Sequence, residues 1–239
     1  MVLVHGWNCD ETVWAAQTSA LGGKLRLIAI DLPGHGQSDA PRIAYTMEHH
    51  ARALDAVLSD AKVKGAVLVG HSNGTPVIRQ FYRKFPEKTR GLVIVDGSLR
   101  PLGDNAMMEK FIAPMRGPEY QAVVARFVDS MVHSIQDAAL REKIKSAILR
   151  TPQHVAVSEM EGLLDPELWR PDKINVPVLM ILAKQPSWTP EYERFVRDLA
   201  PGVDYRVWEN VSHFLMMEKP AEFNAALSEF IDKHRLLNK

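Results

Sequence analysis

One serine stands in a setting suited to nucleophilic chemistry. Ser72 lies in "GHSNG", a G-x-S-x-G pattern that follows the apolar run "AVLV" from Ala66 and precedes an amphipathic stretch. A serine at a sharp strand-to-helix turn, with glycines two residues before and after it, projects its hydroxyl above the sheet. The N-terminus of the following helix favours negative charge that develops at this point. The pattern therefore predicts that Ser72 is a nucleophile.

A nucleophilic serine needs a general base, because its hydroxyl does not ionise near pH 7. The chain has nine histidines, and most are set aside by position. His71 lies inside the turn and is expected to point away from the site. His213, in "WENVSHFLMMEKP", follows the last expected strand and precedes the last expected helix. Its loop opens at the same sheet edge as Ser72, so His213 is the predicted base.

The elements that must position these residues alternate along the chain. Strands are expected at "VLVHG", "LRLIAID", "AVLVG", "GLVIVDG", "VPVLMILA" and "DYRVWEN". Helices are expected at 11–21, 46–58, 75–85, 190–199 and 221–236. Buried strands that alternate with amphipathic helices indicate a parallel sheet covered on both faces. The sequence thus predicts an α/β fold with a mostly parallel, doubly wound sheet of about six strands.

Residues 100–172 interrupt this rhythm, because they contain no convincing strand and carry apolar residues at helical spacing. We expect a helical cap or lid here, inserted into a core formed by residues 1–99 and 173–239. Ligands of open α/β sheets bind at the carboxyl ends of the strands, where such an insert can lie. The alternative is that these helices add packing only.

Five apolar side chains are candidates for a substrate pocket. Methionines and a phenylalanine of the insert would form an adaptable roof, and two aromatic residues flank the site loops. These candidates are Met107, Met108, Phe111, Trp188 and Phe214. Together they favour small to medium hydrophobic groups. The competing interpretation, that most of them form the core of the insert, stays open.

The composition excludes several classes of partner. Lys+Arg and Asp+Glu number 29 each, and no long block of like charge occurs, so nucleic acid is not an expected partner. Cys9 is the single cysteine, and no apolar run reaches the length of a transmembrane helix. We expect no metal and no cofactor. No signal peptide is visible, which favours a cytoplasmic location. The chain begins directly with a strand pattern, so removal of an N-terminal leader remains an alternative.

Four segments resemble the α/β-hydrolase superfamily in the order in which that superfamily carries them. They are "VHGW", "DLPGHGQSD", "GHSNG" and "SHFLMMEKP", and the resemblance covers essentially the whole chain, with the insert least alike. It implies an oxyanion hole at the backbone N–H groups of Trp7 and Asn73. The antiparallel strands that usually precede the first strand are missing from the expected sheet. An exposed sheet edge would favour association, so the expected state is a monomer or a homodimer.

The catalytic acid departs from the commonest pattern of this superfamily. The strand "VPVLMILA" is followed by "KQPSW", which has no carboxylate. Asp96, at the end of "GLVIVD", resembles the acid of haloalkane dehalogenase-like relatives and is the preferred candidate. It would fix the tautomer of His213 and stabilise the imidazolium. Glu191, Glu193 or a dyad without an acid remain alternatives.

Serine at the turn, together with the implied histidine and oxyanion hole, predicts acyl transfer. The expected function is a serine hydrolase that cleaves small to medium hydrophobic carboxylic esters through an acyl-enzyme. Lactonase, cofactor-free perhydrolase and carbon–carbon bond hydrolase activities would use the same residues. A non-catalytic receptor for a small ligand is the alternative from another class.

Overall fold

A single sheet of six strands forms the centre of the molecule, in the computed structural model that describes residues 1–237. The strand order is β2-β1-β3-β4-β5-β6, and every neighbouring pair is parallel. The strands are β1 (Val2–Val4), β2 (Ile28–Ile30), β3 (Ala66–His71), β4 (Thr89–Val95), β5 (Val178–Ala183) and β6 (Asp204–Trp208). The prediction of a mostly parallel sheet of about six strands is confirmed.

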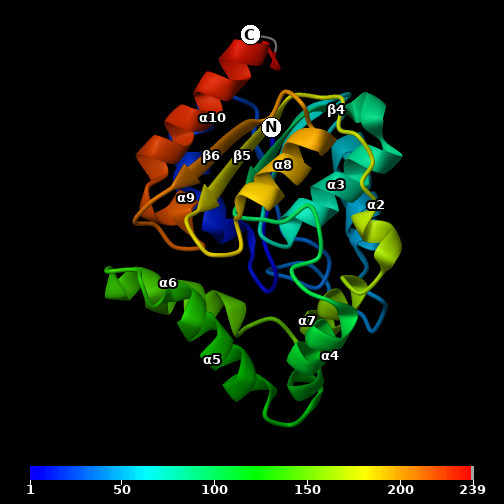
Figure 1. Cartoon of the computed structure of the whole chain (residues 1–239), viewed down its shortest axis with the longest axis vertical. Coiled ribbons are helices and arrows are strands. Elements are labelled where there is room, and N and C mark those ends of the chain that lie inside the picture. The colour runs from blue at the N-terminus through cyan, green and yellow to red at the C-terminus, as the bar shows by residue number, and fades with distance from the viewer. Residues whose placement is uncertain (238–239) are drawn as a thin grey trace.

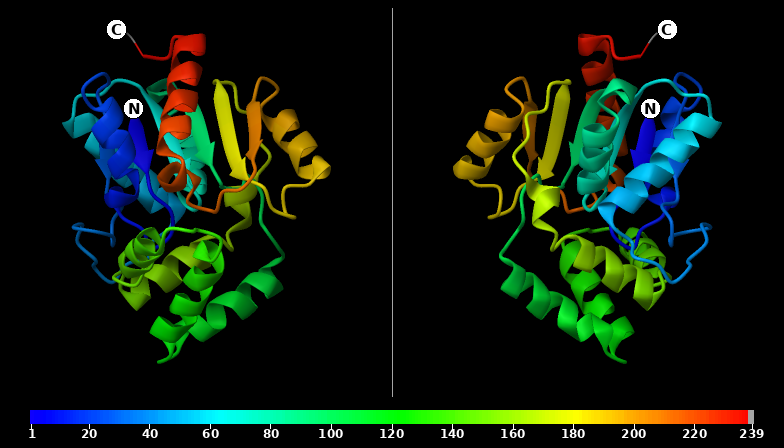
Figure 2. Two further views of the ribbon diagram at one scale, coloured as in Figure 1. Left: turned by 90° about the vertical axis from the view of Figure 1, so that its left-hand side faces the viewer. Right: turned by 90° about the vertical axis from the view of Figure 1, so that its right-hand side faces the viewer.

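Helices cover both faces of the sheet because the strands are apolar on both. Along β3, Val67 and Val69 enter one buried cluster and Leu68 the other. The first cluster lies under α1 (Ala15–Leu21) and α10 (Pro220–His234). The second lies under α2 (Met47–Asp60), α3 (Gly74–Lys84) and α8 (Pro190–Leu199), and Figures 1 and 2 show these two layers on either side of the strands.

Several helices begin at a polar side chain that satisfies a free backbone N–H. The Thr46 hydroxyl accepts a hydrogen bond from the N–H of His49 at the start of α2, and Thr189 does the same for Tyr192 at the start of α8. Within residues 1–237, none of the helices combines the length and the apolar character that crossing a membrane requires.

Four helices and two short 3-10 turns lie between β4 and β5, and we call them the insert. They are α4 (Asn105–Ile112), η3 (Ala113–Arg116), α5 (Tyr120–Val132), α6 (Ala138–Ile148), α7 (Gln153–Gly162) and η4 (Pro166–Trp169). Figures 1 and 2 show α4 to α7 beyond the carboxyl ends of the strands. Buried residues of the insert such as Val124 and Ile144 belong to the same apolar cluster as Val69 of the sheet. The insert therefore packs onto the core.

The structure differs from the sequence expectations at three short elements. The helix expected at 11–21 begins as a 3-10 turn, η1 (Glu11–Trp14), before α1. The strand expected from Leu25 begins only at Ile28, because the N–H of Leu25 is still bonded to the carbonyl of Leu21. A short helix, α9 (Leu215–Glu218), follows His213 and was not anticipated. None of these differences alters the sheet order.

Candidate functional site

The turn between β3 and α3 is tight enough to require its glycines. Ser72 has a φ of +50°, in the left-handed region that non-glycine residues rarely adopt. Its N–H donates to the carbonyl of Val95 at 2.9 Å, which ties the turn to the end of β4. A Cβ on Gly70 would lie 2.6 Å from the carbonyl oxygen of Gly74, and a Cβ on Gly74 would lie 2.6 Å from that of Val4. Close backbone approach thus holds Ser72 in a strained conformation.

His213 and Asp96 are in direct contact. The ring nitrogen Nδ1 of His213 lies 2.6 Å from Oδ2 of Asp96. The other carboxylate oxygen accepts the N–H of Ala183 at 2.8 Å, so Asp96 is fixed at both oxygens. Asp96 is 3% exposed and His213 is 21% exposed. The contact places the proton of neutral His213 on Nδ1 and leaves Nε2 free to accept one.

The two glutamates considered as alternative acids lie elsewhere. Glu191 and Glu193 occupy the first turn of α8, as acidic residues at a helix start often do. They form exposed ion pairs with Arg194 at 2.8 Å and Arg197 at 2.7 Å. Of the carboxylates that the sequence offered, Asp96 is the one that contacts His213.

His71 does not point away from the site, contrary to expectation. Its ring lies 4.6 Å from the ring of His213, and its Nε2 donates to the carbonyl oxygen of His213 at 2.9 Å. Burial, together with His213, holds the pKa of His71 well below its ordinary value, so the ring is neutral. The N–H of Ser212 also donates to the Glu218 carboxylate at 2.7 Å. Hydrogen bonds at the carbonyl of His213 and at the N–H of Ser212 therefore restrain the backbone of this loop.

The loop after β1 lies against Ser72. A Cβ on Gly6 would lie 2.9 Å from the Cβ of Ser72, so only glycine allows this approach. The next residue, Trp7, is buried, and its indole N–H donates to the carbonyl of Ala156 at 2.9 Å. Within residues 1–237, the backbone N–H groups of Trp7 and Asn73 have no hydrogen-bond partner. Neither N–H is therefore engaged by another part of the described chain.

The five pocket candidates are not brought together in one place. Phe214 is buried and lies 5.1 Å from the ring of His71 and 5.4 Å from that of His213. Trp188 packs on Tyr192 at 4.9 Å, within the cluster on the opposite face of the sheet.

The three candidates from the insert differ in how far they are covered. Met107 is 50% exposed and covers Gly103. Met108 is partly buried, and Phe111 packs on Phe127 of α5 at 4.8 Å. These contacts do not involve Ser72, Asp96 or His213.

A buried carboxylate that the sequence analysis did not single out joins the insert to the core. Glu159 of α7 lies 2.6 Å from Nε2 of His50 and 3.3 Å from Nε2 of His35, and all three side chains are almost fully buried. Burial raises the pKa of the Glu159 carboxyl, but His35 and His50 outweigh it and hold the pKa well below its usual range. Nearby, burial lowers the pKa of His5 to about 4. Within the described chain, no group of three or more His, Cys, Asp or Glu side chains could hold a metal ion.

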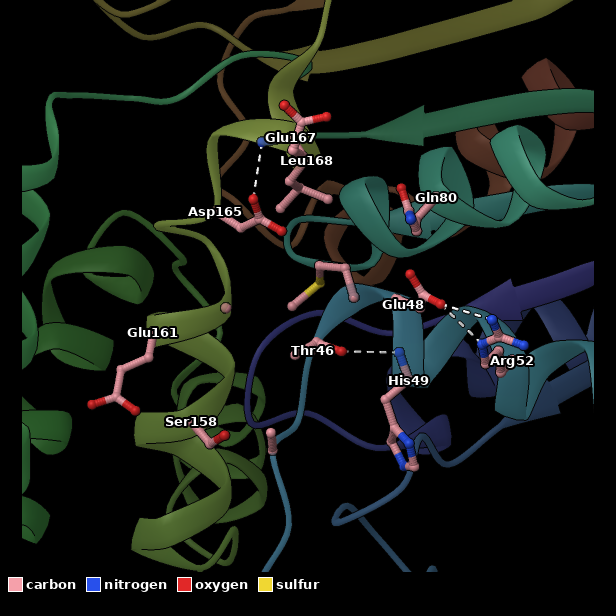
Figure 3. A pocket seen from close by; sticks show the side chains of 13 residues that line it. Thr46, Glu48, His49, Arg52, Gln80, Ser158, Glu161, Asp165, Glu167 and Leu168 are labelled. Carbon is pink, nitrogen blue, oxygen red and sulfur yellow. Dashed lines mark hydrogen bonds and ion pairs between the residues drawn. The ribbon is translucent and has the colours of Figure 1, made fainter.

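An open groove of about 790 Å³ lies between α2, α3 and the end of the insert. Figure 3 shows Ser158 of α7 across the groove from Thr46 and His49, while the side chain of Glu161 points away from them. Its charged groups already have partners, such as Arg52 for Glu48 and Arg116 for Glu161. None of Ser72, Asp96 and His213 lines it, so we separate this groove from the site.

Comparison with known proteins agrees with the six-stranded α/β fold. Residues 1–226 match the alpha/beta hydrolase family. The chain belongs to this family. This membership supports hydrolase activity and confirms the expected superfamily.

Similar proteins include esterases and an enzyme that degrades lactones. The chain is 26% identical to a pimeloyl-[acyl-carrier protein] methyl ester esterase of Vibrio cholerae, over 96% of this chain and 93% of that one. It superimposes with a TM-score of 0.84 on a thermophilic esterase from Thermogutta terrifontis, at 25% identity over 98% of this chain and 89% of that one. The chain also superimposes on Est816, which is described as an N-acyl homoserine lactone degrading enzyme, with a TM-score of 0.82. The two are 26% identical over 96% of this chain and 92% of Est816.

Proposed function

We propose that this hydrolase cleaves carboxylic esters of small to medium hydrophobic substrates, with Ser72 as the nucleophile. The observation that carries the proposal is the 2.6 Å contact between His213 and Asp96, beside a serine held at a left-handed φ. Esterase relatives at 25–26% identity support the same reaction class.

The reaction follows from the protonation states that the contacts favour. Nε2 of His213 takes the proton of the Ser72 hydroxyl while Oγ attacks the ester carbonyl carbon. The Asp96 carboxylate stabilises the resulting imidazolium. The N–H groups of Trp7 and Asn73 bind the oxyanion. His213 then gives the proton to the leaving alcohol, and water activated by the same nitrogen releases the acid from Ser72.

The insert has a place in this proposal as a cap. Residues 100–172 would form a unit over the carboxyl ends of the strands, with residues 1–99 and 173–239 as the catalytic core. Its position in Figures 1 and 2, and its buried contacts with the core, support this division.

A lactone is the second candidate substrate class, because Est816 is as similar to this chain as the esterases are. Ester and lactone hydrolysis pass through the same tetrahedral intermediate on the serine. The two candidates differ in whether the leaving alcohol stays attached to the acyl group.

Hydrolysis of p-nitrophenyl butyrate and of an N-acyl homoserine lactone by the intact chain tests the proposal. Asp96→Asn should lower kcat by about 10²–10⁴-fold, because the tautomer of His213 is no longer fixed. Glu191→Gln is the matched control and should retain activity within about twofold, since its exposed carboxylate pairs with Arg194 and does not contact His213. An inactive intact chain on both substrates, or equal losses in the two variants, would contradict the assignment.

A further inference from the structure

The two residues that follow Gly6 are fastened to the insert. Trp7 and Asn8 are almost fully buried. The backbone bond of this turn, from the N–H of Cys9 to the carbonyl of Gly6, lies within the loop itself. The side chains of Trp7 and Asn8 instead make their hydrogen bonds to residues of the insert, which begin more than 100 positions later in the chain.

Trp7 contacts two helices of the insert. Its indole N–H donates to the carbonyl of Ala156 in α7 at 2.9 Å. Its ring meets that of Phe127 in α5 edge to face, with centroids 5.8 Å apart. An aromatic ring held at both its polar and its apolar side has little freedom to rotate. The backbone of Trp7 is therefore fixed from the side of the insert.

Asn8 closes a ring of three buried hydrogen bonds. Its amide Nδ2 donates to the hydroxyl of Tyr120 in α5 at 3.1 Å, and that hydroxyl donates to the carbonyl of Thr151 at 3.3 Å. The Thr151 hydroxyl returns a hydrogen bond to the carbonyl of Asn8 at 3.2 Å. All three side chains are 5% exposed or less. Removal of one member leaves its partners buried without a hydrogen bond.

We propose that Asn8, Tyr120 and Thr151 are positioning residues. By tying the loop after β1 to the insert, they hold the backbone N–H of Trp7 where it can donate a hydrogen bond to the oxyanion. The inference rests on the proposed function, in which this N–H is an oxyanion donor. An oxyanion donor must be held in place before charge develops, because a donor that has to reorganise stabilises the transition state less. The insert therefore contributes to the catalytic rate, in addition to covering the site.

The proposal makes a kinetic distinction. A cap that only shapes the pocket affects how well the ground-state substrate binds, and its loss appears mainly in KM. A displaced oxyanion donor affects the tetrahedral state, so kcat and the affinity for a transition-state analogue fall together. Loss of stability alone changes neither quantity in the folded enzyme.

Tyr120→Phe in the full chain is the primary test, with Thr151→Val as a second variant that breaks the ring at another bond. Tyr82→Phe is the matched control, because Tyr82 is also buried and its hydroxyl accepts the N–H of Asn175, which lies outside the insert and outside the Asn8 ring. Asn8→Gly removes the side chain but keeps the left-handed backbone, where φ is +56°. Lys62→Gly is the control for Asn8→Gly, because Lys62 has a similar φ of +54° and the new glycine adds the same flexibility to the unfolded chain.

We expect Tyr120→Phe, Thr151→Val and Asn8→Gly to lower kcat for p-nitrophenyl butyrate by about tenfold with KM within about twofold. Binding of a butyl trifluoromethyl ketone, which forms an oxyanion on the serine, should weaken by the same factor. Tyr82→Phe should lower the midpoint of urea unfolding. Both Tyr82→Phe and Lys62→Gly should leave kcat and the affinity for the ketone unchanged. Equal kinetic behaviour of the ring variants and their controls would overturn the positioning role and leave the esterase proposal intact. An intact chain without Ser72-dependent hydrolysis would overturn both.

Discussion

Three different groups restrain His213, and each acts on a different part of the residue. Asp96 binds the ring nitrogen, His71 binds the backbone carbonyl, and Glu218 binds the N–H of the preceding residue. Ring orientation and backbone position are thus controlled separately. In the proposed mechanism His213 exchanges protons in each cycle and needs both, because its Nε2 must return to the same point.

The hydrogen bond from His71 to His213 has a testable consequence. His71→Leu removes the donor and leaves a buried carbonyl unpaired, at a cost of about 1–3 kcal/mol. We expect kcat for p-nitrophenyl butyrate to fall by about tenfold or more. His71→Gln keeps an N–H donor at a similar reach and should retain more of the activity. If the two variants have the same kcat, the hydrogen bond does not position His213.

The sequence was informative about residues whose motif is local. Ser72 and His213 stand in short segments with recognisable neighbours, and Asp96 was singled out by its resemblance to the strand-end acid of haloalkane dehalogenase-like relatives. Glu159 and Tyr120 carried no such signal, because their partners lie far away in the chain. Contacts between the insert and the loops of the core depend on how the insert docks, which periodicity does not encode.

At the scale of elements, the turn between β3 and α3 depends on how closely α3 approaches β1. Gly74, the first residue of α3, lies against the carbonyl oxygens of Val4 and His5. This approach brings the start of the helix and the end of β1 to the same point of the sheet edge. It also places Ser72 beside the loop that begins at Gly6.

Gly74→Ala should therefore be costly. Its Cβ would lie 2.6 Å from the carbonyl oxygen of Val4 and 2.7 Å from that of His5, so the backbone must shift. We expect a loss of about 1–3 kcal/mol in the free energy of unfolding and a strong loss of esterase activity. Gly23→Ala meets nothing within 4 Å and should change stability by about 0.5 kcal/mol or less. Urea unfolding of both variants decides the matter, and similar midpoints would contradict this account of the turn.

Apolar runs located central strands such as β3 and β5, because a strand buried on both faces is apolar throughout. They were less reliable at the ends of elements. The two glycines after Leu21 and the turn that follows them shorten β2, and α9 is a single turn with too few residues to show a period. The docking of α4 to α7 onto the strand ends follows from tertiary packing, which no local pattern contains.

At the scale of the whole molecule, buried histidines tie the stability of the fold to pH. His5 accepts the N–H of Leu32 through Nε2 at 3.0 Å, which requires that nitrogen to be unprotonated. Burial lowers the pKa of His5 to about 4, helped by neighbouring His35, while Gly6, Glu159 and Asp31 oppose the shift. Between pH 6.5 and 4 the unfolded chain binds a proton at this residue that the folded chain does not. Stability from His5 is therefore complete above pH 6.5 and is lost as the pH falls towards 4.

His5→Gln tests this linkage. Over the interval from pH 6.5 to 4, the free energy of unfolding of the wild type should fall relative to that of the variant by up to about 3 kcal/mol. His35 contributes with the opposite sign, because its pKa is raised, and it is present in both proteins. Urea titrations at several pH values measure the effect. Parallel pH profiles for the two proteins would contradict the neutral state of buried His5.

The most direct test of the central claim is the identity of the residue that becomes covalently modified. Paraoxon transfers a diethylphosphoryl group to an activated serine, and peptide mass spectrometry locates it. We predict one label per chain, on the peptide that contains Ser72, in proportion to the loss of p-nitrophenyl butyrate hydrolysis. Labelling should be slower in Asp96→Asn and absent in Ser72→Ala. Label at another residue, or full hydrolytic activity in Ser72→Ala, would contradict the assignment of Ser72 as the nucleophile.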